Sequence, residues 1–446
     1  MRHVELLSPA GTLKNMRYAY AFGADAVYAG QPRYSLRVRN NDFLNDNLRI
    51  GIDEAHRQGK KFYLATNVIP HNAKVKTFLK DMAPLIEMGP DALIMADPGL
   101  IMMIRETWPE MPVHLSVQAN TVNYAAVKFW RSVGIERIIL SRELSLDEIA
   151  EIKQQCPDME LEVFVHGALC IAYSGRCLLS GYFNHRDPNQ GTCTNSCRWK
   201  YDTLPAHENA EGDFVAATGT LSPVALSTAN CGGAERHPLA DNVYFLEEEN
   251  RPGELMPVME DEHGTYIMNS KDLRAIEHVH RLVEIGVDSL KIEGRTKSHY
   301  YVARTAQTYR QAIDDALAGR PFQPELLGVL QNLANRGYTD GFYQRHHTHD
   351  YQNYIDGYSK SHQQQFCGEI RRFDRASGMA EVLVKNKFAV GDRLEIILPE
   401  GNSDLVLERM EDLEGNAMQE APGGGYQVKI PLPASNSDNG LIARYL

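Results

Sequence analysis

Residues 133–167 read VGIERIILSRELSLDEIAEIKQQCPDMELEVFVHG and hold the pattern that decides the fold. A glycine precedes a short apolar run at 137–140, an amphipathic segment follows at 146–155, and a second apolar run occupies 161–165. Short apolar runs bounded by Gly or Asp are typical of buried parallel strands, and apolar residues at helical spacing predict the helix between them. The stretch therefore predicts one strand–helix–strand unit of a parallel sheet.

The same unit repeats through the first part of the chain. Strands are predicted at 4–7, 26–29, 61–66, 92–96, 113–117, 137–140 and 161–165, with helices at 13–22, 76–88, 125–133 and 146–155. An eighth strand at 289–292 follows a predicted helix at 273–285. Eight parallel strands favour an α/β fold of the TIM-barrel-like (β/α)8 type. A doubly wound open sheet is the alternative, but no G-x-G-x-x-G follows any predicted strand.

Three parts of the chain are expected. Residues 1–335 form the (β/α)8-like catalytic domain, with a cysteine-bearing insertion at about 168–265 and a long closing helix at 300–318. Residues 336–362, rich in Tyr, His, Gly and Gln, are predicted to be a linker. Alternating runs such as MAEVLVKN and DRLEIILP then predict short antiparallel strands, so we expect residues 363–446 to form a small β-barrel domain.

Composition limits the class of protein. The chain has 446 residues, 43% hydrophobic and 23% charged, which is the composition of an ordinary soluble globular protein. It contains no run of 18 apolar residues, and its start, MRHVELLSPAG, lacks the apolar core of a signal peptide. We therefore expect a cytoplasmic protein with no membrane partner. The net charge of −12 disfavours non-specific coating of nucleic acid and leaves open a local basic patch.

Polar side chains lie at or near the ends of the predicted strands. The carboxyl ends of barrel strands face a shared mouth, where catalytic groups normally lie. Any one of these side chains alone is as readily a buried, hydrogen-bonded structural group, but together they indicate a site. They are Glu5, Ser8, Gln31, Asn67, Asp97, Gln118, Asn120, Arg142, Glu143, Glu162, His166, Glu293 and Arg295.

Arginines are concentrated near this expected mouth. The loop GQPRYSLRVRNNDF, residues 30–43, carries Arg33, Arg37 and Arg39. Arginines that converge on a cavity suit an anionic substrate such as a dicarboxylate or a phosphate. Arg295 either pairs with Glu293 or holds a substrate carboxylate through both of its terminal nitrogens.

Four of the seven cysteines fall within 28 residues, at the spacing C-x6-C-x15-C-x3-C: Cys170, Cys177, Cys193 and Cys197. Cys231 lies further downstream. Such clustering in a reducing compartment favours metal ligation, and thiolates suit either zinc or an Fe–S cluster. Wide, irregular spacing beside a catalytic mouth favours Fe–S, with zinc as the alternative. A peptidase pair of Cys170 and His166 is a further alternative, but it leaves the other cysteines unexplained.

Several motifs together resemble one known family. The run EVFVHGALC (162–170) is followed by SGRCLLS (174–180) and QGTC (190–193). ELLSPAG (5–11), the arginine-bearing loop, NSKDL (269–273) and SLKIEGR (289–295) extend the match over nearly the whole chain. These residues resemble the U32 peptidase-like family.

That resemblance implies an oxygen-independent hydroxylase. Members are linked to hydroxylation of the tRNA wobble uridine to 5-hydroxyuridine, of a ribosomal RNA cytidine, or of a ubiquinone precursor. They carry a [4Fe–4S] cluster on four cysteines, and prephenate is associated with the two RNA reactions. We therefore expect a tRNA modification enzyme. The alternatives are a U32-type, collagenase-like peptidase and a non-catalytic RNA-binding or cluster-carrying module.

Functional residues follow from the resemblance and from the strand ends together. The expected cluster ligands are Cys170, Cys177, Cys193 and Cys231, with Cys197 as a competing fourth ligand. The expected catalytic residues are Glu162, His166 and Glu293. The expected substrate-binding residues are Arg37, Arg39, Asn67, Gln118, Arg142 and Arg295. The expected partners are tRNA, bound through a local face, a small dicarboxylate co-substrate, and a ferredoxin-type or cluster-delivery protein.

Overall fold

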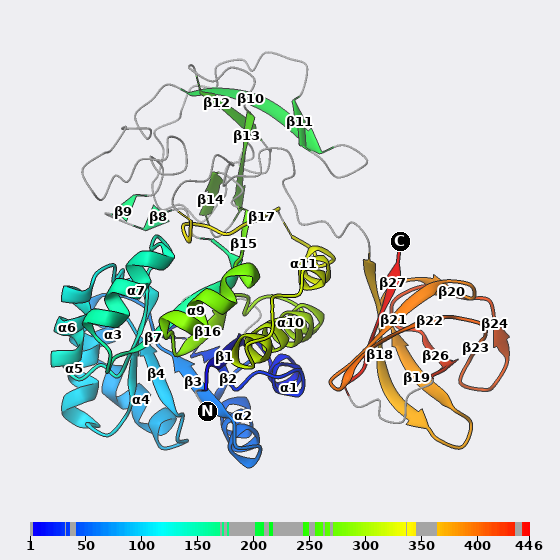
Figure 1. The fold of residues 1–446 in the computed structure, drawn as a ribbon, viewed down its shortest axis with the longest axis horizontal. Coiled ribbons are helices and arrows are strands. Elements are labelled where there is room, and N and C mark those ends of the chain that lie inside the picture. The colour runs from blue at the N-terminus through cyan, green and yellow to red at the C-terminus, as the bar shows by residue number, and fades with distance from the viewer. Residues whose placement is uncertain are drawn as a thin grey trace.

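A closed barrel of parallel strands forms the first domain (Figure 1). The computed structural model describes residues 3–31, 33–35, 42–169, 271–335, 337–344, 364–432 and 439–446, with the backbone of seven strands between 172 and 267. The barrel strands are β1 (Glu5–Pro9), β2 (Ala26–Gly30), β3 (Lys61–Ala65), β4 (Ala92–Met95), β5 (Val113–Leu115), β6 (Arg137–Ile139), β7 (Glu160–Ala168) and β16 (Ser289–Ile292). Each pairs in parallel with the next, and β16 pairs with both β7 and β1. The pairing of β16 with both β7 and β1 closes the ring of strands, whereas an open doubly wound sheet would leave two edge strands unpaired. The predicted (β/α)8 barrel is therefore confirmed.

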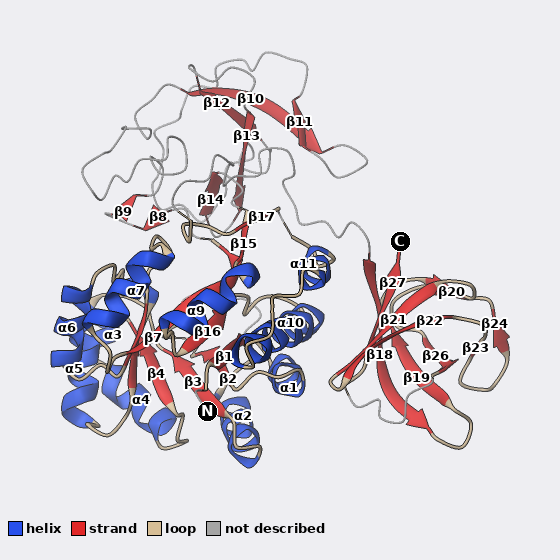
Figure 2. Ribbon diagram, in the orientation of Figure 1, coloured by secondary structure: helices blue, strands red, loops and turns tan. Residues whose placement is uncertain are grey.

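Helices cover the outside of the barrel (Figure 2). They are α1 (Leu13–Ala21), α2 (Asn45–Arg57), α3 (Asn72–Val75), α4 (Phe78–Ile86), α5 (Pro98–Thr107), α6 (Tyr124–Ser132), α7 (Leu146–Gln155), α9 (Val279–Ile285), α10 (His299–Leu317) and α11 (Glu325–Gln331). Local signals set their ends. Ser145 and Glu148 form a capping box at the start of α7, and Gly286, at φ 105°, ends α9. Asp97 accepts a hydrogen bond from the Leu100 N–H, so it caps α5.

The stretch predicted as one helix at 273–285 begins differently. Residues Asp272–Arg274 form β15, which pairs antiparallel with the end of β7, and only Val279–Ile285 form an α-helix. Apolar spacing alone favoured a longer helix. Residues Asp272–Arg274 form a strand because pairing with β7 satisfies backbone N–H and C=O groups at the end of β7 that would otherwise lack hydrogen-bond partners.

Part of the segment predicted as a linker lies against the barrel. Strand β17 (Tyr338–Thr339) pairs in parallel with β15. The Tyr343 hydroxyl donates to the Phe164 carbonyl at 2.5 Å, and the Tyr343 side chain is buried. Residues 345–363 lie outside the described residues.

The insertion between β7 and β15 is built from β-strands. These are β8 (Ala172–Tyr173), β9 (Arg176–Cys177), β10 (Tyr201–Glu208), β11 (Phe214–Ala216), β12 (Tyr244–Glu248), β13 (Leu255–Asp261) and β14 (Gly264–Ile267). Strands β11-β10-β12-β13-β14 form an antiparallel sheet, and β8 pairs with β9. In Figure 1 these strands lie beyond the end of the barrel at which β15 is drawn. The insertion therefore lies at the end of the barrel where β7 ends.

The C-terminal region is an antiparallel β domain, as predicted. Its strands are β18 (Gln364–Asp374), β19 (Met379–Val384), β20 (Phe388–Ala389), β21 (Arg393–Leu398), β22 (Gly401–Val406), β23 (Met410–Glu411), β24 (Ala417–Met418), β25 (Glu420–Ala421), β26 (Gln427–Pro431) and β27 (Leu441–Tyr445). Eight of them form one sheet in the order β22-β21-β27-β18-β19-β26-β23-β24. Among the described residues, no pairing joins β22 to β24. The sheet encloses its own apolar core, which includes Val382, Phe388 and Ile430.

The β domain packs on the barrel through α10. Ile397, Leu441 and Ala443 belong to the main apolar core. The buried Arg304 of α10 forms a two-pronged ion pair with Glu395 of β21, at 3.0 and 2.9 Å. Within the described ranges, no helix is long and apolar enough to cross a membrane.

Candidate active site

A polar cavity of about 330 Å³ lies at the carboxyl ends of the barrel strands. Five residues predicted from strand ends line it together: Asn67, Gln118, Arg142, Glu293 and Arg295. The other lining residues are Tyr28, Ala65, Ile94, Ser116, Val117, Ile139, Phe164 and Lys291. The lining residues come from seven of the eight barrel strands or the segments that follow them. Convergence of polar groups on one concave site is the arrangement expected of a binding or catalytic cavity.

One wall of the cavity combines guanidinium groups with aromatic rings. The guanidinium carbon of Arg142 lies 3.8 Å from the centre of the Phe164 ring, and its Nη2 lies 3.7 Å from Glu293 Oε2. The guanidinium carbon of Arg295 lies 5.9 Å from the centre of the Tyr28 ring. A ring face orients a guanidinium without using its hydrogen-bond donors. These arginines are therefore suited to bind carboxylates.

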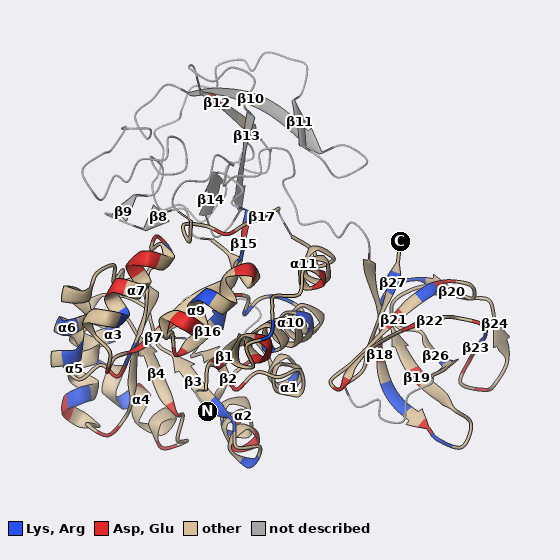
Figure 3. Ribbon diagram, in the orientation of Figure 1, with Lys and Arg blue, Asp and Glu red and all other residues tan. Residues whose placement is uncertain are grey.

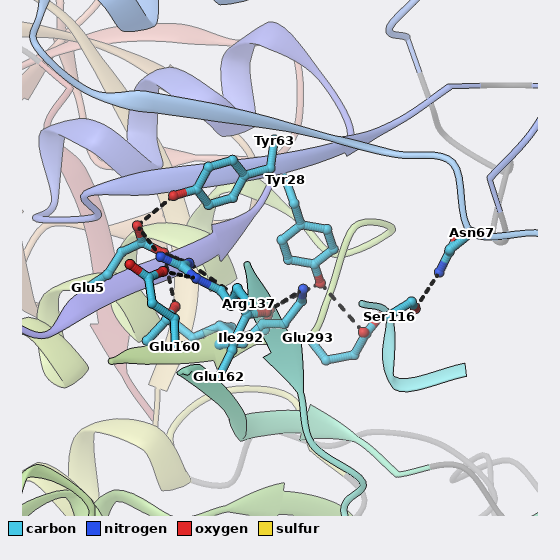
Figure 4. Close-up of polar contacts among 12 residues, drawn as sticks. Glu5, Tyr28, Tyr63, Asn67, Ser116, Arg137, Glu160, Glu162, Ile292 and Glu293 are labelled. Carbon is cyan, nitrogen blue, oxygen red and sulfur yellow. Dashed lines mark hydrogen bonds and ion pairs between the residues drawn. The ribbon is translucent and has the colours of Figure 1, made fainter. Parts of the chain in front are cut away.

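Tyr28 fixes the carboxylate in this wall. Its hydroxyl donates to the Ile292 carbonyl at 3.0 Å and lies 3.4 Å from Glu293 Oε2 (Figure 4). Glu293 is the single carboxylate among the lining residues, and it is 7% exposed. A carboxylate that faces a cavity and has few contacts with water is a candidate to accept or donate a proton.

Two glycines make room for this wall. A Cβ on Gly30 would clash with Nη1 of Arg295 and with Oγ of Ser35. Gly167 has φ of +102°, and a Cβ there would clash with the Glu293 backbone oxygen. A side chain at either position would displace the charged group next to it.

The opposite wall carries amides. Asn67, after β3, donates to Ser116 Oγ at 3.2 Å (Figure 4). Ser116 also accepts from the Gln118 N–H at 3.4 Å, which starts the short 3₁₀ turn Val117–Ala119. Amide groups donate and accept, so this wall suits neutral oxygen-bearing groups.

A layer of buried charges lies below the cavity, inside the barrel (Figure 4). Lys291 Nζ lies 2.7 Å from Glu162 Oε1, and Arg137 Nη1 lies 3.4 Å from Glu162 Oε2. Arg137 also pairs with Glu5 at 2.5 Å and with Glu160 at 2.8 Å. Glu162 is fully buried. The predicted catalytic Glu162 is thus a partner of two cations beneath the cavity and does not line it.

Electrostatics keep this layer ionised around Glu5. Burial alone would raise the pKa of Glu5, but Arg137 and hydrogen bonds from Tyr63 and Ser289 outweigh it and lower the pKa. The Tyr63 hydroxyl donates to Glu5 Oε2 at 2.6 Å, and burial raises the pKa of Tyr63. Glu5 therefore stays a carboxylate and Tyr63 a neutral donor at physiological pH.

Lys291 connects the buried layer to the cavity. Its Nζ lies 4.3 Å from the Tyr28 ring centre and 5.4 Å from the Phe164 ring centre, and the residue lines the cavity. Burial lowers the pKa of Lys291, although the Glu162 carboxylate opposes this shift. Lys291 therefore adds a third basic side chain to Arg142 and Arg295 at the cavity.

His166 does not lie where the sequence placed it. The pairing of β7 with β16 matches Phe164 to Lys291 and then His166 to Ile292, with a register shift between them. Phe164 and Lys291 both line the cavity, so the extra residue turns His166 away from it. The prediction that His166 reaches the mouth is wrong, because one bulge reverses the side on which a side chain lies.

His166 instead packs against the outer helix α10. Its Nδ1 lies 3.3 Å from the Tyr309 hydroxyl, and its ring contacts those of Tyr301 and Tyr338. Burial, helped by nearby positive charge, lowers the pKa of His166 to about 3. The imidazole is therefore neutral at physiological pH and belongs to the packing between β7 and α10.

Two groups of predicted residues lie wholly or partly outside the described residues. Arg37 and Arg39 lie outside the described residues, while Arg33 of the same loop pairs with Asp81 at 2.8 Å. Cys170, Cys193, Cys197 and Cys231 also lie outside them, and of Cys177 only the backbone, in β9, is described. Cys156 and Cys367 are buried free thiols. Among the described residues, no group of three His, Cys, Asp or Glu side chains could hold a metal ion.

Four important cavity residues were missed from the sequence: Tyr28, Ser116, Phe164 and Lys291. Only one carried a usable signal. Lys291 is a charged residue inside the short apolar strand SLKI, and such a residue must face a lumen or a partner. The two aromatic residues looked like ordinary core residues of buried strands.

Comparison with known proteins gives the family. The model of peptidase family U32 matches residues 11–353, and that of the U32 C-terminal domain matches 362–444. This protein belongs to peptidase family U32. A U32 peptidase of known structure is 15% identical over 44% of this chain and 85% of its own, with a TM-score of 0.34.

Curated U32 relatives carry names that refer to RNA. The tRNA hydroxylation protein P of Escherichia coli is 64% identical over 430 residues, covering 96% of this chain and 94% of that protein. The tRNA hydroxylation protein P1 of Bacillus subtilis is 34% identical, covering 96% and 92%. The 23S rRNA 5-hydroxycytidine C2501 synthase of Escherichia coli is 31% identical, covering 71% of this chain and 40% of that protein.

Proposed function

We propose that this protein hydroxylates the wobble uridine of tRNA to 5-hydroxyuridine, independently of oxygen, with prephenate as co-substrate and a [4Fe–4S] cluster. The observation that carries the proposal is the cavity in which Arg142, Arg295 and Lys291 meet a single lining carboxylate, Glu293. The names of full-length U32 relatives support tRNA as the substrate.

The cavity is suited to a small dicarboxylate with a flat ring. Arg142 and Arg295 would each bind a carboxylate through paired N–H donors. Phe164 and Tyr28 offer apolar faces to the ring, and the amides of Asn67 and Gln118 suit a hydroxyl or keto oxygen. Prephenate has these three features: two carboxylates, a six-membered ring and a keto group.

Proton transfer would fall to Glu293. Its carboxylate lines the cavity and is held by the Tyr28 hydroxyl and Arg142. Glu162 cannot take this role directly, because it is fully buried and paired with Lys291 and Arg137. Glu162 would instead hold Lys291 in position under the substrate.

The chemistry of the donor set fits an Fe–S cluster. Cys170, Cys177, Cys193 and Cys231 would hold it, with Cys197 as the competing fourth ligand, and thiolates are the ligands that such clusters use. When bound, the cluster would supply electron transfer or accept an oxygen-bearing group. The segment that carries these cysteines starts where β7 ends, on the side of the cavity. A ferredoxin-type or cluster-delivery protein is the partner such a cluster would require.

The peptidase alternative lacks support at the cavity. A cysteine peptidase needs a thiol and a base in contact. Its proposed base, His166, packs against α10, and its pKa is lowered to about 3 by burial. Cys156 and Cys367, the described thiols, are buried outside the cavity.

Nucleoside analysis of tRNA tests the RNA reaction. In a strain that lacks this gene and any redundant pathway, the wild-type gene should restore 5-hydroxyuridine derivatives measured by mass spectrometry. Glu293→Gln should reduce them strongly. Arg131→Ala, which removes an exposed cation paired with Asp158 on an outer helix, is the matched control and should restore them fully. Unchanged nucleosides in the deletion strain would exclude this substrate.

Metal analysis tests the cofactor separately. Protein prepared without oxygen should contain about four iron and four sulfide per chain if the cluster is of the [4Fe–4S] type. Cys170→Ala should lose iron without losing the folded barrel, as measured by circular dichroism. Colourless protein with one zinc per chain and no iron would contradict the cluster.

A further inference from the structure

A cluster of cations surrounds one buried carboxylate at the junction between the barrel and the β domain. Glu369 of β18 is 1% exposed, and Lys14 of α1, Arg371 of β18 and Lys385 approach it to 2.6, 3.1 and 3.1 Å. His299 Nε2 lies 3.1 Å away as well. We call Lys14, Arg371, Lys385 and Glu369 the junction cluster. Three cations and one carboxylate leave an excess of two positive charges.

The cations of the junction cluster are accessible, whereas its carboxylate is not. The side chains of Lys14, Arg371 and Lys385 are 38%, 51% and 35% exposed. Their mutual repulsion is not cancelled, because one carboxylate can neutralise only one of them. Burial lowers the pKa of Lys14, and Lys385 and Arg371 add to this while Glu369 opposes it. An anion at the surface would relieve that repulsion.

Other exposed ion pairs of the β domain differ from the junction cluster because each has one cation for one carboxylate. Lys387 pairs with Glu420 at 2.7 Å, and Arg393 pairs with Asp404 at 2.5 Å, one cation to one carboxylate. Such balanced surface pairs have little net charge to offer a ligand. The excess at the junction cluster is also opposite in sign to the chain as a whole, whose net charge is −12 and whose basic and acidic residues are interspersed along the ribbon (Figure 3).

The cluster lies at the same end of the barrel as the cavity. Lys14 is in the first turn of α1, which follows β1, and His299 is the first residue of α10, which follows β16. Both helices therefore start at the carboxyl ends of strands, where the cavity opens. Asn15 Nδ2 donates to the Lys297 carbonyl at 2.9 Å and holds the two helix starts together. The segment SLKIEGR, residues 289–295, lies shortly before α10 in the chain and contains the cavity residues Glu293 and Arg295.

We propose that the junction cluster binds phosphates of the tRNA backbone and so docks the substrate RNA beside the cavity, an inference that rests on the proposed function. Lys and Arg at a surface bind phosphate groups without reading sequence, and they position RNA for a reaction elsewhere. Glu369 is a positioning residue, because it holds Lys14, Arg371 and Lys385 together at the surface. An acidic protein is the competing partner.

Salt-dependent binding of the full-length protein to unmodified tRNA, followed by fluorescence anisotropy, tests this surface. In Arg371→Ala/Lys385→Ala we expect affinity to fall roughly tenfold or more near 0.1 M salt, and the slope of log K against log salt to fall by about two. Lys385→Arg should keep the wild-type slope. Lys387→Ala is the matched control, since it removes a balanced cation from the same domain.

The outcomes separate the docking surface from the reaction. Wild-type slope and affinity in the folded double variant would overturn the docking surface alone. Equal loss of binding to polyglutamate and to tRNA would assign the cluster to anions in general and overturn RNA docking. Failure of the wild-type protein to bind tRNA would overturn both this surface and the proposed reaction. A single-turnover assay should show a raised half-saturating tRNA concentration in the double variant with an unchanged maximal rate.

Discussion

The barrel lumen and the domain junction hold charge clusters that differ in balance and in exposure. In the lumen Arg137 and Lys291 balance the two buried carboxylates Glu5 and Glu162, and Arg137 also pairs with the half-exposed Glu160. At the junction one carboxylate, Glu369, contacts three cations and nothing completes it within the described residues. The four lumen side chains that balance one another are at most 6% exposed, whereas the junction cations are 35% to 51% exposed. Removing one member of a balanced buried cluster leaves an uncompensated charge inside the fold, whereas an unbalanced exposed cluster is available to a ligand.

Loss of Arg137 should give the largest effect. Arg137→Leu leaves Glu5 and Glu162 buried without their shared cation, so we expect the free energy of unfolding to fall by about 3–5 kcal/mol. Urea denaturation followed by circular dichroism measures this. Arg137→Leu/Glu5→Gln should recover part of the loss, because it removes one of the unpaired charges. A stability change below about 1 kcal/mol in Arg137→Leu would show that the lumen cluster does not hold the barrel together.

The cavity arginines should give a large effect on activity with little on stability. Arg142→Lys keeps the charge but loses the planar fork, so we expect the half-saturating prephenate concentration to rise roughly tenfold or more. Steady-state assays with varied prephenate measure this, at saturating tRNA. An unchanged prephenate dependence would remove Arg142 from substrate binding.

The buried histidine should make stability depend on pH. Burial lowers the pKa of His166 to about 3 from 6.5, so the unfolded chain binds the extra proton between these values. Its contribution to stability is complete above about pH 6.5 and is lost as pH falls toward 3. His166→Phe should flatten the stability profile over that range while the wobble modification persists. Loss of modification in a stable His166→Phe variant would give the imidazole a chemical role.

The smallest effect should come from the junction. Lys385→Ala removes one cation from an excess, so we expect the free energy of unfolding to change by less than about 0.5 kcal/mol. Thermal unfolding at low and moderate salt measures this. Lys291→Met, which removes a cation from the balanced lumen, should cost several times more. Equal costs for the two substitutions would erase the distinction between the clusters.

Much of the fold was predictable because apolar runs and glycine boundaries repeat with each strand–helix unit. The eighth strand, Ser289–Ile292, was placed correctly across the long insertion because its pattern matches the others. Strand β15 was missed, because it is defined by pairing with β7 and not by a local pattern.

The site was predictable where residues follow a strand. Asn67, Gln118, Arg142, Glu293 and Arg295 all reach the cavity, because strand ends of a barrel converge regardless of detail. His166 was misplaced by a register shift that no single sequence reveals. That Phe164 and Lys291 point inward could not be predicted, because the sequence does not show which face of each strand borders the lumen. Only closure of the barrel determines that face.

The central claim is that the cavity at the barrel mouth carries out the hydroxylation of tRNA. Its most direct test is mass spectrometry of wobble nucleosides from a strain whose only copy of this gene carries Arg142→Ala/Arg295→Ala. We predict normal levels of folded protein and iron with loss of 5-hydroxyuridine derivatives by a hundredfold or more, roughly the effect of removing preorganised charged contacts. Wild-type levels of these nucleosides would contradict the assignment of the cavity as the active site.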